Sequence, residues 1–172
     1  GLYEANLAMH DCDLMINVGA RFDDRITGRV QDFSPRSKKA HIDIDPSSVN
    51  KVIHVDMPII GDVAAVLSEL QRVWREKGAR TNKAALAKWW ARIAEWRNVD
   101  CLAYEQTGRA IKPQHAVQRL EDLTRGRDRY ITTEVGQHQM WAAQYLRFDE
   151  PNRWMTSGGL GTMGYGFPAS IG

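Results

Sequence analysis

Short apolar runs alternate with amphipathic segments along the 172-residue chain. Residues 4–10 have a helical composition, and the run LMINV at 14–18 is typical of a buried strand. Further strands are expected over residues 39–45 and 54–60. Pro58 indicates that the last of these is an edge strand or that a strand ends there, because proline cannot donate a hydrogen bond to a neighbouring strand.

Polar segments connect these strands. Residues 21–28 are expected to form a polar loop, and Ser47 or Ser48 is expected to cap a short helical turn after Pro46. Asp62 is a suitable N-cap for an amphipathic helix that ends near Gly78. Six apolar residues of this helix share one stripe: Val63, Val66, Leu67, Leu70, Val73 and Trp74.

The second half of the chain begins after a loss of periodicity. A helix over residues 83–97 carries three tryptophans, which we interpret as packing anchors, and residues 101–112 are then expected to be a linker. Pro113, a favourable first helical residue, opens a new helix. A strand, a helix and a short strand are expected next, over residues 130–135, 136–146 and 154–156. This alternation predicts an α/β fold with parallel sheets.

Composition excludes several classes of protein. Hydrophobic residues make up 43% and charged residues 26%, the balance of a soluble globular protein, and a net charge of +2 argues against nucleic-acid binding. No apolar stretch approaches the roughly 18 residues of a membrane span. Cys12 and Cys101 lie far apart without a CxxC partner, so neither a disulfide nor a metal site is expected, and Cys12 is interpreted as a structural thiol.

The two ends of the sequence indicate an internal piece of a longer protein. The chain opens on Gly1 without an initiator methionine or a signal peptide. It closes on FPASIG, which has the pattern of a helix that is just beginning. We therefore expect neighbouring segments on both sides.

A glycine-rich segment is the first candidate for chemistry. Gly159, Gly161 and Gly164 spell GxGxxG between a predicted strand and a predicted helix, which by spacing alone is a dinucleotide fingerprint. The acidic residue that would support this interpretation falls beyond Gly172. Five glycines in the nine residues 158–166 indicate a tight turn against a ligand or a strand.

Polar residues at strand ends are the other candidates. Gln137 and His138 follow a predicted strand and open a helix, where α/β sheets bind ligands and free amides suit an anion; an ordinary strand–helix corner is the alternative. In the first half, VGARFDDR, IDIDP and Gly61-Asp62 each follow a strand. Asp43 and Asp45 have the geometry to accept ribose hydroxyls, and Arg21 could meet a phosphate. A nucleotide site is favoured over solvated loops.

The runs VGARFDDR, HIDIDP, GQHQMWAAQ and SGGLGTMGYGFPA, in this order and spacing, resemble the large catalytic subunit of the acetolactate synthase (acetohydroxyacid synthase) family of thiamine-diphosphate enzymes. The resemblance covers essentially the whole chain. It implies a parallel-sheet, Rossmann-like central FAD-binding domain over residues 1–100, a linker over 101–112, and the start of a thiamine-pyrophosphate-binding α/β domain over 113–172.

The resemblance also implies the positions of the ligands. The residues that line FAD are Gly1, Gly19, Ala20, Arg21, Phe22 and Asp23, and those against its adenosine part are Asp43, Ile44, Asp62 and Val63. The residues at the diphosphate of thiamine diphosphate are Gln137 and His138, and those beside its rings are Gly161, Thr162 and Met163, with Met163 supporting the bent cofactor. Arg25 matches an arginine linked to the carboxylate of the second substrate; a surface salt bridge to Asp23 or Asp24 is the alternative.

The implied reaction is decarboxylation of pyruvate and condensation of the hydroxyethyl unit with pyruvate or 2-oxobutyrate, in branched-chain amino-acid (valine and isoleucine) biosynthesis. The implied cofactors are thiamine diphosphate, FAD as a structural group, and Mg²⁺. A homodimer or tetramer, a possible regulatory small subunit and, in a bacterium, a cytoplasmic location are expected. The family's activating glutamate and metal motif lie outside these residues, so no catalytic acid or metal ligand is assigned here, and this piece alone is expected to be inactive.

Other functions stay open at this point. Another thiamine-diphosphate carboligase or decarboxylase, such as a glyoxylate carboligase or a pyruvate oxidase-like enzyme, shares parts of the pattern, but RFDDR and GQHQMWA favour the synthase. An NAD-dependent oxidoreductase or a non-catalytic nucleotide-binding module would use the GxGxxG spacing differently. One departure from the family pattern is Glu134, where many relatives have aspartate.

Overall fold

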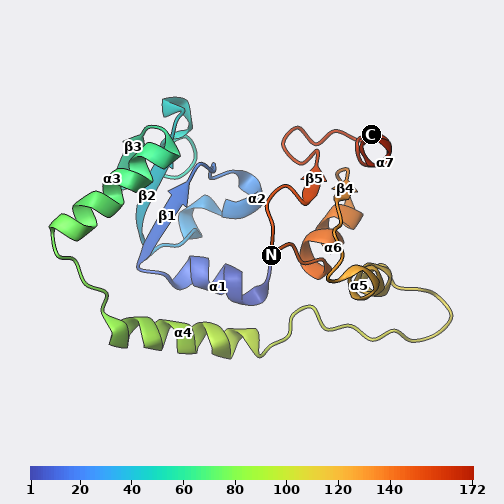
Figure 1. The fold of residues 1–172 in the computed structure, drawn as a ribbon. Coiled ribbons are helices and arrows are strands. Elements are labelled where there is room, and N and C mark those ends of the chain that lie inside the picture. The colour runs from blue at the N-terminus through green and yellow to red at the C-terminus, as the bar shows by residue number, and fades with distance from the viewer. The chain divides into compact units, whose positions relative to one another are not determined.

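The computed structural model describes residues 1–172, which form two compact units, Gly1–Cys101 and Leu102–Gly172 (Figure 1). The helices and strands of the first unit are α1 (Tyr3–Asp11), β1 (Leu14–Val18), α2 (Asp24–Thr27), η1 (Val30–Asp32), β2 (Lys38–Asp43), η2 (Pro46–Ser48), β3 (Met57–Ile60), α3 (Val63–Glu76) and α4 (Lys83–Arg97). Those of the second are α5 (Pro113–Thr124), β4 (Ile131–Thr133), α6 (Gln137–Tyr145), β5 (Trp154–Thr156) and α7 (Gly166–Ile171). None of the helices combines the length and apolar character needed to cross a membrane.

The first unit is built on a three-stranded parallel sheet in the order β1-β2-β3. Its register places Asn17 opposite His41, and Ile42 opposite Ile59. Pro58 lies in the edge strand β3, as its missing amide hydrogen predicts. The predicted α/β class with a parallel sheet is therefore confirmed for this unit.

The core of the first unit lies beneath the loop that follows β1. Phe22, Ile53 and Val55 form the buried cluster, with three partly buried residues around it: Met15, Phe33 and Val49. Phe22 contacts Phe33 edge to face, with ring centroids 5.8 Å apart. The loop between β1 and β2 is therefore anchored to the core by the side chain of its own residue Phe22.

Two expectations for the connecting segments are wrong in detail. Residues 21–28 contain a helical turn, α2, because the Asp23 carboxylate accepts a hydrogen bond from the Arg25 amide and caps it. The turn η2 is capped by Asp45, not by Ser47 or Ser48, because the Asp45 carboxylate precedes the turn and accepts from the Ser47 amide. In both cases an aspartate just before the turn supplies the cap.

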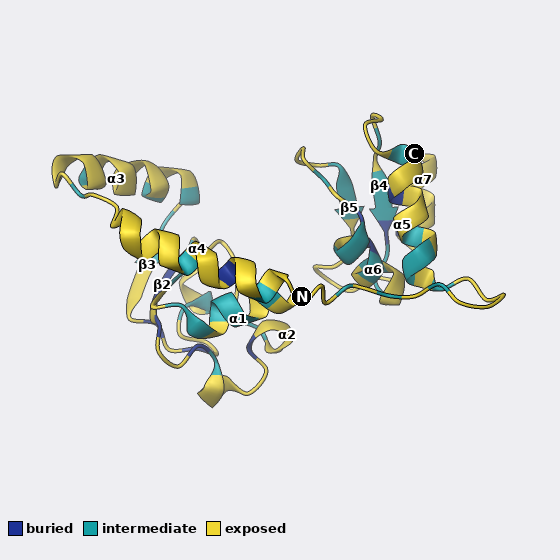
Figure 2. Ribbon diagram, turned by 90° about the horizontal axis from the view of Figure 1, so that it is seen from below, coloured by how far each residue is buried: buried dark blue, intermediate teal, exposed yellow.

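The helix α3 is capped as the sequence predicts, but both long helices, α3 and α4, are covered only in part. The Asp62 carboxylate accepts from the Ala65 amide at the start of α3. The apolar stripe of α3 is nevertheless solvent-facing at Trp74, which is 55% exposed, and Figure 2 shows α3 and α4 mainly as exposed surface. In α4, Trp89 and Trp96 contact each other edge to face, which confirms their packing role, whereas Trp90 is 56% exposed and does not anchor the helix.

The second unit contains a parallel pair of short strands, with Thr132 of β4 opposite Met155 of β5. The indole of Trp154 donates to the Thr133 hydroxyl at 3.0 Å, and its ring stacks on Phe148. Parallel pairing confirms the α/β class here too. It also brings the carboxyl ends of β4 and β5, and the loops that follow them, to the same edge.

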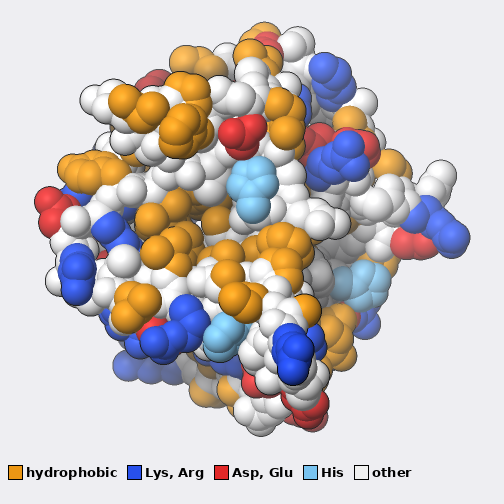
Figure 3. Space-filling view, turned by 90° about the vertical axis from the view of Figure 1, so that its right-hand side faces the viewer, with side chains coloured by type: hydrophobic (Ala, Val, Ile, Leu, Met, Phe, Trp, Pro, Cys, Tyr) orange, Lys and Arg blue, Asp and Glu red, His pale blue; other side chains and the backbone are white.

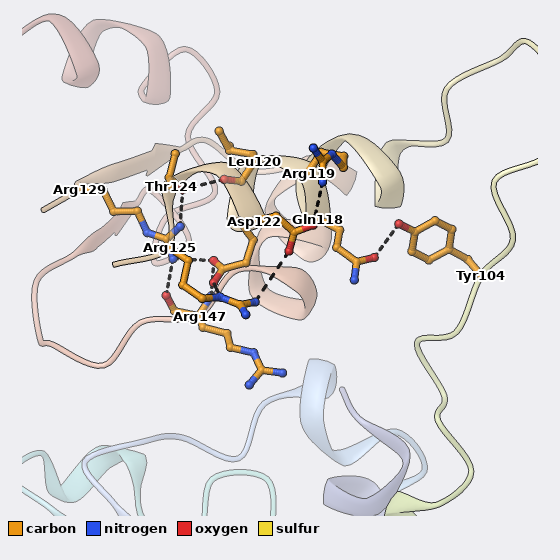
Figure 4. A network of polar contacts seen from close by, with 10 residues as sticks. Tyr104, Gln118, Arg119, Leu120, Asp122, Thr124, Arg125, Arg129 and Arg147 are labelled. Carbon is orange, nitrogen blue, oxygen red and sulfur yellow. Dashed lines mark hydrogen bonds and ion pairs between the residues drawn. The ribbon is translucent and has the colours of Figure 1, made fainter. Parts of the chain in front are cut away.

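The segment before α5 has no regular structure, yet side chains hold it against α5 and α6. The Tyr104 hydroxyl donates to Gln118 Oε1 at 2.6 Å, a contact visible in Figure 4. The Tyr145 hydroxyl donates to the Leu102 carbonyl at 2.9 Å, and the two tyrosine rings meet edge to face. Loss of periodicity in the sequence therefore marks irregular backbone that is nonetheless packed.

A buried carboxylate organises the far end of α5. Glu121 is 2% exposed and accepts hydrogen bonds from the Arg129 guanidinium, the Arg147 amide and the Arg125 guanidinium. Arg129 also donates to the Thr124 hydroxyl and to the Arg147 carbonyl, as the dashed lines in Figure 4 show. Burial tends to raise the pKa of Glu121, but the hydrogen bonds from Arg129, Arg147 and Arg125 outweigh it and lower the pKa.

Candidate functional site

The loops after the three parallel strands of the first unit are tied together at one edge of the sheet. The Gly19 amide donates to the Ile42 carbonyl at 2.8 Å, and the Gly61 amide donates to the Asp43 carbonyl at 3.0 Å. Gly19 has a φ of +61°, which favours glycine. The three motifs singled out in the first half of the sequence therefore meet at the carboxyl edge, where α/β sheets bind ligands.

The loop after β1 presents unused hydrogen-bond donors. The backbone amides of Ala20, Arg21, Phe22 and Asp23 donate to no group in the chain. Phe22 is buried, so the loop is fixed to the core at that residue. A fixed loop with several free amides suits the oxygen atoms of an anionic or carbonyl-bearing ligand.

The charged residues of this loop divide into paired and unpaired groups. Arg21 forms an ion pair with Asp23, at 3.1 Å between Nε and Oδ2, and its side chain is 72% exposed. The Arg25 guanidinium forms no ion pair with Asp23 or Asp24, so the salt-bridge alternative for Arg25 is wrong. Its guanidinium is therefore available to a carboxylate ligand.

The aspartates after β2 have different tasks. Asp45 accepts from the amide and hydroxyl of Ser47 and from the hydroxyl of Ser48, and these hydrogen bonds, with the Ser47 amide foremost, lower the pKa of Asp45. Both of its oxygens thus serve the turn, which does not favour the expectation that Asp45 accepts a ribose hydroxyl. Asp43 accepts from the Asp45 amide through Oδ1 and keeps Oδ2 near His41.

The remaining expected residues of the first unit vary in placement. Ile44 follows directly after β2 and is 70% exposed. Val63 is the first residue of α3 and lies close to Gly19: a Cβ atom added at Gly19 would lie 3.6 Å from the Val63 Cγ2 methyl group. Asp62 uses one oxygen as the N-cap of α3. Gly1 lies beside Asn6 ahead of α1, and no hydrogen bond joins it to the three strand ends.

In the second unit the glycine-rich turn folds back onto the end of β4. The Gly164 amide donates to Glu134 Oε2 at 2.5 Å, and the Thr132 hydroxyl donates to the Gly166 carbonyl at 2.7 Å. Within the turn, the Ser157 hydroxyl donates to the Thr162 carbonyl at 2.5 Å. Strand and turn are therefore joined by side chains that the sequence motif alone did not identify.

The glycines of this turn have separate physical roles. Gly161 and Gly164 have φ values of +75° and +77°, which side chains other than glycine rarely adopt. A Cβ atom added at Gly166 would lie 2.8 Å from the Glu134 amide nitrogen, so only glycine fits against β4. The turn leaves Met163 67% exposed at its tip.

The helix α6 begins at the same edge. Gln137 and His138 form its first turn, where backbone amides have no acceptor within the helix. The side-chain nitrogen Nε2 of Gln139 donates to the Thr156 hydroxyl at 2.9 Å, which ties α6 to the end of β5. The structure thus places Gln137 and His138, and the turn of residues 161–163, after two neighbouring parallel strands.

Comparisons with known families agree with this arrangement. Residues 1–70 match the central domain of thiamine pyrophosphate enzymes, and residues 134–172 match their C-terminal, TPP-binding domain. The chain belongs to the thiamine pyrophosphate enzymes. This assignment favours the glycine turn as part of a thiamine site over the nicotinamide fingerprint, because the turn lies inside the matched TPP-binding domain.

The chain is similar over its whole length to acetolactate synthases. The chain is 45% identical over all of its 172 residues to the acetolactate synthase isozyme 3 large subunit of Escherichia coli (strain K12). It is 45% identical to the acetolactate synthase large subunit of Haemophilus influenzae and 41% identical to an acetolactate synthase of Mycobacterium bovis. The chain spans about 30% of the length of the first two relatives and 28% of the third.

Proposed function

We propose that the longer protein containing this chain is an acetolactate synthase, which decarboxylates pyruvate and condenses the hydroxyethyl unit with pyruvate or 2-oxobutyrate. The observation that carries the proposal is 40–45% identity to acetolactate synthases over the whole chain. The matched thiamine pyrophosphate domains support the same class of chemistry. This reaction would serve branched-chain amino-acid biosynthesis.

Thiamine diphosphate, when bound, supplies an electron sink that lets a 2-oxo acid lose carbon dioxide. We assign its diphosphate to Gln137 and His138, where the first-turn amides of α6 favour an anion. We assign its rings to a second group: Gly161, Thr162 and Met163. An exposed Met163 on a turn fixed by Glu134 supports this assignment, because the turn can hold an apolar side chain against a ring without moving.

FAD is the second cofactor of the proposal, with a structural task. We assign it to the edge where the first unit's three strand ends meet, with these residues along it: Gly1, Gly19, Ala20, Arg21, Phe22 and Asp23. Its adenosine part is assigned to Asp43, Ile44, Asp62 and Val63. The free amides between Ala20 and Asp23 support the loop assignment, whereas no contact in the structure supports Gly1.

Arg25 is assigned to the carboxylate of the second 2-oxo acid. Its guanidinium has no ion pair within the chain, and a guanidinium binds a carboxylate through two parallel hydrogen bonds. Such a fork would orient the acceptor as well as neutralise its charge. The assignment gives Arg25 a task in substrate recognition and none in proton transfer.

We also propose the organisation of the whole enzyme. Residues 1–100 would belong to the central domain, 101–112 to a linker and 113–172 to the thiamine-binding domain. The first compact unit, Gly1–Cys101, supports the end of the central domain, whereas the second unit, Leu102–Gly172, includes most of the proposed linker. Mg²⁺ and the activating glutamate would be provided outside this chain. A homodimer or tetramer, with a possible regulatory small subunit, is supported by the similarity to acetolactate synthase large subunits. Large apolar side chains such as Leu160 and Phe167 are 96% and 75% exposed in this chain, as expected for a surface that the rest of the longer protein or a partner subunit covers. Figure 3 shows hydrophobic side chains gathered in patches on one face.

The test is an assay of the full-length protein with pyruvate, with thiamine diphosphate, Mg²⁺ and FAD omitted in turn. Acetolactate should form only when thiamine diphosphate and Mg²⁺ are present, and addition of 2-oxobutyrate should give the mixed product. The 172-residue piece should form none. Condensation of glyoxylate in preference to pyruvate would indicate a glyoxylate carboligase, and nicotinamide-dependent turnover without thiamine diphosphate would refute the proposal.

A further inference from the structure

Two side chains from neighbouring strands converge on one backbone carbonyl. Asn17 of β1 and His41 of β2 are register partners in the parallel ladder. The Asn17 amide nitrogen Nδ2 and the His41 ring nitrogen Nε2 each lie 2.8 Å from the carbonyl oxygen of Ala20. Both acceptor positions of that oxygen are therefore occupied by groups of the sheet itself.

The histidine of this pair is unusual for a core residue. His41 is fully buried, and its ring contacts Phe22 edge to face with centroids 5.3 Å apart. Because a carbonyl oxygen only accepts, Nε2 must carry the hydrogen. Nδ1 is then left buried without a hydrogen-bond partner. A buried unpaired nitrogen costs free energy, so apolar packing alone does not account for a histidine at this position.

The two hydrogen bonds to the Ala20 carbonyl also determine where the next backbone amide points. In a trans peptide the carbonyl oxygen and the following amide hydrogen point to opposite sides. No peptide bond in the chain is cis. Fixing the Ala20 oxygen toward Asn17 and His41 therefore turns the Arg21 amide away from them, and the amides from Ala20 to Asp23 have no partner in the chain.

We propose that Asn17 and His41 are positioning residues for the flavin: they hold the loop of residues 19–23 in its binding conformation before FAD arrives. The inference rests on the proposed assignment of this loop to FAD. A loop that is already ordered loses less conformational entropy on binding, so the pair raises the affinity for FAD without touching it. Phe22 belongs to the same loop, and its buried ring, packed against His41, fixes the loop to the core.

The experiment measures FAD affinity of the full-length apoenzyme by flavin fluorescence, with activity measured against FAD concentration. We expect H41L to weaken FAD binding about tenfold, which is about 1.4 kcal/mol. N17L, at a partly exposed position, should weaken it about threefold. H41Q should stay within threefold of the unmodified protein, because Gln Nε2 can reach the Ala20 oxygen as a donor. At saturating FAD, H41L should recover most of its kcat.

A matched control separates positioning from general stability. Ile93 is a buried residue of α4, remote in sequence from the loop, and I93A should lower the melting temperature while leaving FAD affinity unchanged. The inference is refuted if H41L and N17L bind FAD as tightly as the unmodified protein, or if I93A and H41Q weaken binding as much as H41L. If H41L does not fold, the inference is refuted when N17L binds FAD as tightly as the unmodified protein, or when H41Q weakens FAD binding as much as N17L does. Absence of FAD binding by the unmodified protein would instead refute the flavin assignment, and the inference with it.

Discussion

The carboxylate of Glu134 accepts a hydrogen bond from the backbone amide of Gly164, 2.5 Å away and 30 residues later in the chain. This contact joins the end of β4 to the turn that carries Met163. An ionised acceptor makes such a bond about twice as strong as a neutral one. Glu134 thus fixes the turn that we assign to the thiamine rings, without itself belonging to the assigned set.

Replacing Glu134 tests that contact. E134A should raise the thiamine diphosphate concentration for half-maximal activity by about 10-fold or more, the loss expected for one charge-assisted hydrogen bond of about 1.5–3 kcal/mol. E134Q retains an acceptor oxygen and should change it by no more than about threefold. Activation of the full-length apoenzyme by added thiamine diphosphate measures both. Equal effects of E134A and E134Q would show that charge, and not the hydrogen bond to Gly164, is what matters.

The close approach of Gly166 to β4 gives a stability prediction. In G166A the new Cβ would lie 2.8 Å from the Glu134 amide nitrogen and 2.9 Å from the Thr133 carbonyl carbon, so the backbone must move. We expect a loss of about 1–3 kcal/mol, as for other overpacked positions. G159A is the matched control, since nothing lies within 4 Å of its added Cβ. Melting curves of the two variants should differ, and a G166A protein as stable as G159A would contradict the packing of the turn.

The buried Glu121 predicts how stability depends on pH. Because its folded pKa lies below the unfolded value of about 4.3, its contribution is present above that pH and is lost as the pH falls through the folded pKa. E121Q, which leaves Arg129 with a neutral partner, should cost about 3 kcal/mol near neutral pH. Melting temperatures of E121Q and the unmodified protein should therefore converge in acid. A difference that is the same at neutral and acidic pH would contradict the charged pairing.

D122N controls for charge at the same helix end. Asp122 is 41% exposed at its side chain and makes long contacts with Arg119 and Arg125, at 3.4 and 3.9 Å. Exposed pairs of this kind contribute about 0–1 kcal/mol. D122N should therefore change the melting temperature far less than E121Q at neutral pH.

The unpaired Arg25 predicts a change in substrate recognition. R25K keeps the charge but removes the planar fork, so KM for the second 2-oxo acid should rise about tenfold, while the rate of pyruvate decarboxylation changes little. Product analysis with pyruvate and 2-oxobutyrate in competition gives the preference directly. R29K is the matched control, because Arg29 is paired with Asp32. If R25K decarboxylates and condenses like R29K, Arg25 does not bind the acceptor.

Local patterns in the sequence predicted most of the secondary structure. The run LMINV is the strand β1, Asp62 caps α3, and Pro113 opens α5, because apolar periodicity and capping act over a few residues. The errors are also local: the caps at Asp23 and Asp45 were missed, since several polar residues compete for each turn. The exposure of Trp90 could not be read from spacing, because a helical stripe does not specify what covers it.

The sequence by itself indicated which motifs are candidates for chemistry and which family their order resembles. Only the tertiary structure decided how they are held, because contacts such as Glu134 with Gly164, or Asn17 and His41 with Ala20, join residues from different strands and loops. Residue types can indicate a glycine turn or a polar strand end. Which carbonyl a buried histidine meets depends on strand register, and register is fixed only when the sheet forms.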